Sequence, residues 1–146
     1  MYQESGRSMV EIIGVIAIMT LISAGAFALI RSGMAAQKRG VIIDDVSKIV
    51  SGIRSLYADY DDLSTLDGDS ALAAMAVDKN GPNGVEYSVV KKEQGTNWYP
   101  KFTVTISKLS IKDCNVLGTK AWAGAESSTG TTKCSNDKKI EITYSK

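Results

Sequence analysis

The chain has 146 residues, enough for one domain with an appendage, and its formal net charge is +1. This balance gives no global electric field that would favour nucleic acid or anionic lipid. The sequence contains no histidine, which excludes hydrolases built on Ser-His-Asp or Cys-His groups. It also offers no glycine-rich phosphate loop and no metal-ligand constellation, so we predict no enzymatic activity, no metal site and no cofactor.

The first element in the chain is an apolar run of nineteen uncharged residues, 12–30. As a helix, at ~1.5 Å per residue, it would span roughly 28 Å, close to the ~30 Å hydrocarbon core of a bilayer. The run is longer than the apolar part of a secretory signal peptide, and its Ala24-Gly25-Ala26 lies inside it, with more apolar chain following. Two interpretations remain: an ordinary membrane anchor, or a rod held in the membrane first and packed against protein later.

Helical periodicity continues beyond the apolar run and predicts one long helix over residues 8–60, roughly 80 Å in length. No proline interrupts it. Gly25, Gly33 and Gly40 each weaken it by about 1 kcal/mol relative to alanine, so we expect bending or local melting there. The second half is amphipathic, with a single apolar stripe made by Ile42, Val46, Ile49, Ile53, Leu56 and Tyr60.

The remaining chain has the patterns of short strands, turns and short helices. Turn residues stand at 67–69 and 80–84, and a short helix between them, capped by Asp69 or Ser70, runs to residue 77. A second short helix, residues 110–118, has Ser110 as its cap and Gly118 at its end. Residues 119–137 read as an irregular loop. Alternating apolar residues predict three half-buried antiparallel strands, at 85–90, 101–109 and 139–145.

These elements predict an α+β fold in which the long N-terminal helix packs on a small antiparallel sheet. The only two cysteines, Cys114 and Cys134, are best explained by one disulfide in an oxidising compartment. The alternative is a pair of free thiols in a cytosolic domain. The count of positive charges favours that alternative. More of them follow the apolar run than precede it, which would place the C-terminal side of the run in the cytoplasm.

Two surface groups are candidates for binding, and each has a simpler explanation. The acidic group lacks the spacing of a calcium loop, which favours a solvated helix end with turn caps. The aromatic group is more typical of side chains that anchor loops to a core than of a binding surface. The acidic group consists of Asp59, Asp61, Asp62, Asp67 and Asp69, and the aromatic group of Trp98, Tyr99 and Trp122.

The stretch GRSMVE, residues 6–11, followed by the apolar run, resembles the N-terminal motif of the type IV pilin superfamily, which comprises type IV pilins and type II secretion pseudopilins. The motif is a short leader ending in glycine, cleavage after that glycine, glutamate at the fifth mature position and about twenty apolar residues. It covers about the first 30 residues, and its spacing matches here without adjustment. One departure is Arg7, because family members usually begin the mature chain with an apolar residue.

The resemblance implies a division of the chain into a leader (1–6), a transmembrane and filament-core half of the helix (7–30) and a periplasmic globular domain (31–146). Cleavage between Gly6 and Arg7 would free the α-amine of Arg7, which is also the implied N-methylation site. Glu11 would pair with the amine of a neighbouring subunit in the assembled filament. Because a lone carboxylate in the membrane is costly, an ion pair in the filament core would offset its desolvation and set the axial register.

The globular part has a second resemblance, to type IVb pilins, in which a disulfide encloses a C-terminal variable region. Cys114 and Cys134 match this arrangement, and the loop 115–133 would be the exposed, variable surface of the filament. The family implies a helical homopolymer made from an inner-membrane precursor. The implied partners are a prepilin peptidase, an assembly ATPase and an inner-membrane platform protein, and the implied destination is an extracellular pilus.

Other functions stay open at this stage. Within the family, the chain would alternatively be a minor pilin or a type II secretion pseudopilin. Outside it, the chain would be a membrane-anchored periplasmic binding module that never polymerises. The role of a filament in adhesion, conjugation, DNA uptake, motility or secretion is not encoded in these patterns, nor is a receptor.

Overall fold

The computed structural model describes residues 5–61, 63–92, 100–126 and 138–146, with side chains from Met9 onward. By its internal contacts the chain divides into two units, Met1–Lys38 and Arg39–Lys146. The described elements are α1 (Ser5–Leu56), α2 (Gly68–Ala74), the 3₁₀ turn η1 (Pro82–Gly84), α3 (Ile111–Gly118) and the strands β1 (Glu86–Lys92), β2 (Lys101–Ser107) and β3 (Ile140–Ser145). The predicted α+β class is confirmed.

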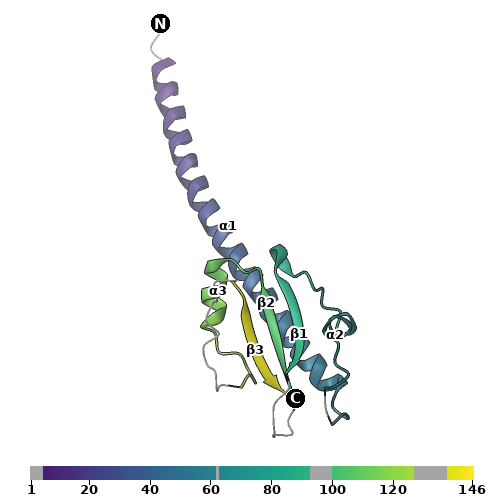
Figure 1. The fold of residues 1–146 in the computed structure, drawn as a ribbon. Coiled ribbons are helices and arrows are strands. Elements are labelled where there is room, and N and C mark those ends of the chain that lie inside the picture. Colours follow the sequence, from purple (N-terminus) through teal and green to yellow (C-terminus); the bar gives the residue numbers. More distant parts are fainter. Residues whose placement is uncertain (1–4, 62, 93–99, 127–137) are drawn as a thin grey trace. The chain divides into compact units, whose positions relative to one another are not determined.

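α1 forms most of the first unit and also supplies a core element of the second (Figure 1). It continues without interruption through Gly25, Gly33 and Gly40, so the expected local melting was wrong. The residues between these glycines are mostly good helix formers, which offset the cost of each glycine. α1 ends at Leu56, four residues earlier than predicted. The chain beyond it carries Asp59 and Asp61, and negative charge is unfavourable at the negative end of the helix dipole.

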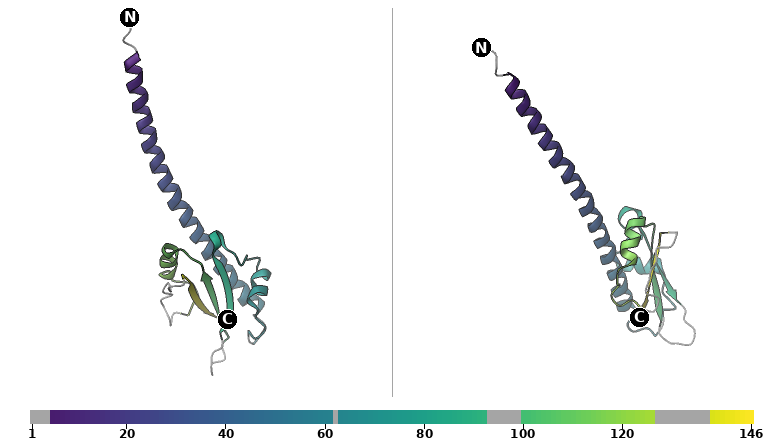
Figure 2. Two further views of the ribbon diagram at one scale, coloured as in Figure 1. Left: turned by 45° about the horizontal axis from the view of Figure 1, so that its top comes forward. Right: turned by 90° about the vertical axis from the view of Figure 1, so that its left-hand side faces the viewer.

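The sheet is antiparallel, in the order β1-β2-β3, and one of its faces packs on the C-terminal part of α1 (Figures 1 and 2). Its register places Tyr87 opposite Ile106, and Val104 opposite Ile142. The predicted inward residues of all three strands are buried, which confirms the alternation along each strand. These residues are Val85, Tyr87, Val89, Phe102, Val104, Ile106, Ile140, Ile142 and Tyr144.

The apolar stripe of α1 was predicted correctly for its first four residues and wrongly for its last two. Its first four members, Ile42, Val46, Ile49 and Ile53, are buried in the core. Leu56 and Tyr60 are instead about half exposed, because the helix stops before a further turn could lie over the sheet. Three residues outside the predicted stripe are buried in the core. These are Val50 on the same helix and Leu63 and Leu66 after it.

The short helices flank the sheet, with α2 against β1 and α3 against β3 (Figure 1). Asp67, rather than Asp69 or Ser70, caps α2, and its carboxylate accepts from the Ser70 backbone N–H at 3.1 Å. α3 begins as predicted, with Ser110 accepting from the Asp113 N–H. The C-terminal cap of α3 is Thr119, not Gly118, and α3 occupies the first part of the predicted variable loop.

Strand β2 ends at Ser107, two residues before the predicted end, because Lys108 has a φ of +60° that an extended strand does not allow. The following residue, Leu109, is buried and donates its N–H to the carbonyl of Lys138. The turn predicted at 80–84 is confirmed as η1, where Asn83 and Gly84 have φ values of +61° and +76°.

Candidate functional site: the first unit and a pocket in the second

The predicted cleavage site lies on helical backbone. Gly6 and Arg7 are the second and third residues of α1, whose start at Ser5 is three residues earlier than we predicted. Glu11 lies one turn further along the same helix and is exposed. No cationic side chain that the structure describes forms an ion pair with Glu11.

The apolar run that follows Glu11 is exposed along its whole length. Side chains such as Leu21 (75 % exposed), Phe27 (68 %) and Leu29 (74 %) contact little else in the described chain. The helix is long and apolar enough to cross a membrane, judged from its length and composition. Thr20 and Ser32 donate their hydroxyl protons to carbonyls one turn back, at 2.8 and 2.9 Å. Such internal hydrogen bonds suit an apolar environment, where unpaired polar groups are costly.

The two cysteines are only partly within the described structure. Cys114 lies on α3, is fully buried and is not a free thiol. Cys134 lies outside the described residues, as do the larger part of the predicted loop 119–137 and the aromatic residues Trp98 and Tyr99. The pairing of Cys114 with Cys134 accordingly stays a prediction.

Two residues of the predicted acidic group, Asp67 and Asp69, have structural roles at the start of α2. A hydrogen bond from the Ser70 hydroxyl, together with the Ser70 backbone N–H, lowers the pKa of the Asp67 carboxyl. Asp69 forms an ion pair with Lys79 at 3.0 Å. Asp62 lies outside the described residues. In the part of the chain that is described, no group of three acidic or sulfur ligands could hold a metal ion.

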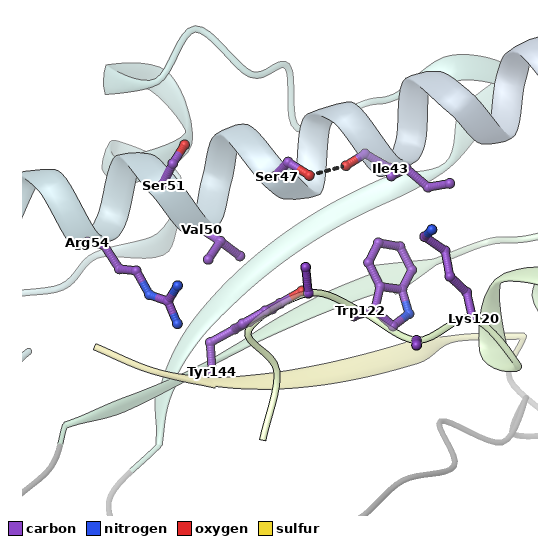
Figure 3. A pocket seen from close by; sticks show the side chains of 10 residues that line it. Ile43, Ser47, Val50, Ser51, Arg54, Lys120, Trp122 and Tyr144 are labelled. Carbon is purple, nitrogen blue, oxygen red and sulfur yellow. Dashed lines mark hydrogen bonds between the residues drawn. The ribbon is translucent and has the colours of Figure 1, made fainter. Parts of the chain in front are cut away.

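The second unit contains a pocket of about 510 Å³ between α1, residues 120–123 and β3 (Figure 3). Arg54 lies at one end of it, and Lys120 and Trp122 lie at the other, with Tyr144 between them. Trp122 is half-buried, packs against the core and donates its indole N–H to the Leu117 carbonyl at 3.2 Å. The prediction that Trp122 anchors its loop to the core is confirmed.

Sequence analysis missed this pocket. Its lining comes from three segments, and Arg54 and Lys120 are 66 residues apart in the chain. No spacing rule connects such positions. The only available signal was an arginine on the flank of the apolar stripe, and a flanking arginine is typical of any solvated helix face.

Comparisons of the chain with protein-family models, with curated proteins and with solved structures find no match.

Proposed function

We propose that this chain is a structural subunit of a type IV pilus, most similar to the type IVb kind. The observation that carries the proposal is Glu11 at the head of an exposed apolar helix, five positions after Gly6. The α+β architecture, with a long N-terminal helix and a three-stranded antiparallel sheet, is compatible with a pilin-like fold.

The exposed apolar surface of residues 9–30 requires an environment other than water. Exposed patches of this kind mark interaction with membranes or with protein, because each Å² of apolar surface removed from water is favourable by about 25 cal/mol. The bilayer is the first environment and copies of the same helix are the second. A contact between different surfaces of identical subunits repeats without closing and builds an open helical filament.

Glu11 has a specific role in this proposal. Cleavage after Gly6 by a prepilin peptidase exposes the α-amine of Arg7, which is then N-methylated. In the filament the Glu11 carboxylate pairs with the Arg7 amine of a neighbouring subunit, which offsets the cost of burying the charge. Removing either partner leaves an uncompensated charge in an apolar core, so the pair selects one axial register.

The remaining partners follow from the family resemblance. The precursor spans the inner membrane once, with its globular domain in the periplasm. An assembly ATPase and a platform membrane protein extract it into the growing pilus outside the cell. The Cys114–Cys134 disulfide forms in the same oxidising compartment and encloses the C-terminal surface region.

Two measurements test the proposal. Mass spectrometry of the protein purified from its host should give a chain that begins at Arg7 and carries a methyl group. Electron microscopy of the cell surface should show filaments that are lost with Glu11→Ala and retained with Asp44→Ala, which removes an exposed carboxylate further along α1. A chain that begins at Met1, or normal filaments with Glu11→Ala, would contradict the proposal.

A further inference from the structure

The pocket of the second unit has a cation at each end, with Tyr144 between them and Trp122 beside Lys120 (Figure 3). Along α1 its lining extends from Ile43 to Arg54, two positions that are eleven residues apart, which corresponds to roughly 16 Å of helix. Its volume, about 510 Å³, lies within the range of roughly 300–1,000 Å³ that is typical of small-molecule sites. The pocket is thus long enough for an extended ligand rather than for a single small ion.

Both cations of the pocket have no carboxylate partner among the described residues. The Arg54 guanidinium donates only to backbone carbonyls, those of Ser145 at 3.1 and 3.2 Å and Gly124 at 3.3 Å. Lys120 is exposed. Six other cations do lie within 4.0 Å of a carboxylate: Arg39, Lys48, Lys79, Lys101, Lys108 and Lys139. Among the described residues, therefore, no carboxylate compensates the positive charge at the pocket, which favours an anionic ligand.

The two serines of the pocket can accept hydrogen bonds, and Tyr144, which also belongs to the lining, has a hydroxyl that can donate or accept. The Ser47 hydroxyl donates its proton to the Ile43 carbonyl at 2.9 Å, and the Ser51 hydroxyl donates to the Lys48 carbonyl at 3.2 Å. Each serine oxygen keeps its lone pairs for a donor in the pocket. The indole of Trp122 is held in place by its hydrogen bond to Leu117 and presents apolar surface.

From these three features we infer that the pocket binds a carboxylated sugar, as a unit of two linked rings. The carboxylates meet Lys120 and Arg54, the sugar hydroxyls donate to Ser47 and Ser51, and an apolar sugar face lies against Trp122. An aliphatic dicarboxylate satisfies the cations but supplies no donor for the serine oxygens. A neutral sugar leaves both cations without a partner. The inference does not depend on assembly into a filament.

Binding is tested with the full chain in a zwitterionic detergent that contains no sugar. Digalacturonate, two linked rings with one carboxylate each, is titrated and followed by calorimetry and by tryptophan fluorescence. Lys120→Gln should weaken binding about tenfold, the effect of losing one charge-assisted hydrogen bond. Lys112→Gln removes the same charge from an exposed position on α3 outside the pocket, and should leave the affinity unchanged. Equal affinities of the two variants would overturn the inference.

Two further ligands and one further variant separate the contributions of the carboxylates, the sugar rings and the Ser47 hydroxyl to binding. The dimethyl ester of digalacturonate keeps the rings without the charges, and suberate keeps two carboxylates without the rings; both should bind at least tenfold more weakly. Suberate binding as tightly as digalacturonate would overturn the sugar assignment. Ser47→Ala should weaken binding about threefold, whereas Ser55→Ala, outside the pocket lining, should not. Glu11→Ala should not change the affinity, so failure of the filament proposal would be distinguishable from failure of this one.

Discussion

The phenolic hydroxyl of Tyr87 donates a hydrogen bond to the carboxylate of Asp45 across 3.1 Å. Tyr87 is an inward residue of β1 and only 1 % exposed, whereas Asp45 lies on α1 at the border of the core. The ring of Tyr87 also lies close to the backbone at Gly81, where an added Cβ would approach it to 2.7 Å. One side chain thus connects the sheet, the helix and the 80–84 turn.

Tyr87→Phe should lower the free energy of unfolding by about 1–2 kcal/mol. The ring keeps its packing, but the bond to a charged acceptor is lost, and such bonds contribute roughly 1.5–3 kcal/mol. Water partly replaces the lost hydrogen bond to the Asp45 carboxylate, because this side chain is not fully buried. The measurement is urea unfolding of the full chain in detergent, followed by tryptophan fluorescence. Tyr60→Phe, at an exposed site, is the control and should change nothing beyond error.

Alkaline pH should destabilise the globular unit. Burial raises the pKa of Tyr144 from 10.0 to about 12, partly opposed by the Arg54 charge, and burial together with the Asp45 carboxylate raises the pKa of Tyr87. Unfolded tyrosines lose their protons near pH 10 while the folded ones retain them. The free energy of unfolding should therefore be unaffected below about pH 9 and fall from about pH 10 toward 12, by about 1.4 kcal/mol per pH unit for each tyrosine.

The alkaline prediction is measured as urea unfolding at a series of pH values, for the natural chain and for Tyr87→Phe. The variant lacks one of the two titrating hydroxyls, so its stability should fall less steeply above pH 10. Because surface lysines titrate equally in both proteins, the difference between the two curves isolates Tyr87. Parallel curves would show that Tyr87 does not retain its proton in the fold.

Gly68→Ala should destabilise the fold by about 1–3 kcal/mol or more. A Cβ at Gly68 would lie 2.2 Å from the carbonyl oxygen of Val89 on β1, so α2 or the strand must move. Gly40→Ala is the matched control, because nothing lies within 4 Å of its Cβ and the site is helical. That change should be neutral or raise the helix stability by up to about 1 kcal/mol. Thermal unfolding monitored by circular dichroism compares the two, and equal shifts would contradict the proposed close approach.

The predicted disulfide should appear in a peptide map prepared without reductant, as one peptide pair containing Cys114 and Cys134. Loss of the bond in Cys134→Ser should lower the free energy of unfolding by about 3 kcal/mol, from the greater freedom of the unfolded chain. The natural chain after reduction should lose the same amount. If reductant leaves its stability unchanged, the two cysteines are not paired.

Local periodicity was sufficient for most of the secondary structure. Alternation in the strands identified Tyr87, Val104 and Ile142 as inward residues, and they are buried. A 3.6-residue period identified Ile42 and Ile49 as residues on the apolar face of α1, and they are buried. These assignments depend only on which side of an element a residue faces, and that is a property of its neighbours in sequence.

Boundaries were less predictable, because several adjacent residues compete for the same role. Asp67 caps α2 although Asp69 and Ser70 have similar capping propensity, and the conformation of the preceding chain decides among them. α1 was expected to reach Tyr60, but the helix ends at Leu56 and the core is completed by Leu63 from beyond it. Which leucine closes the core depends on the path of the turn, not on the helical period.

The sequence by itself determined the α+β class, the exposed apolar half of α1 and the motif around Gly6 and Glu11, because each depends on a short, contiguous pattern of residues. Only the tertiary structure brought Arg54 and Lys120 to the two ends of one pocket, with Trp122 beside Lys120. It also left both cations without a carboxylate among the described residues. Such arrangements depend on how distant segments pack together, and no local period specifies the distance between two residues 66 positions apart.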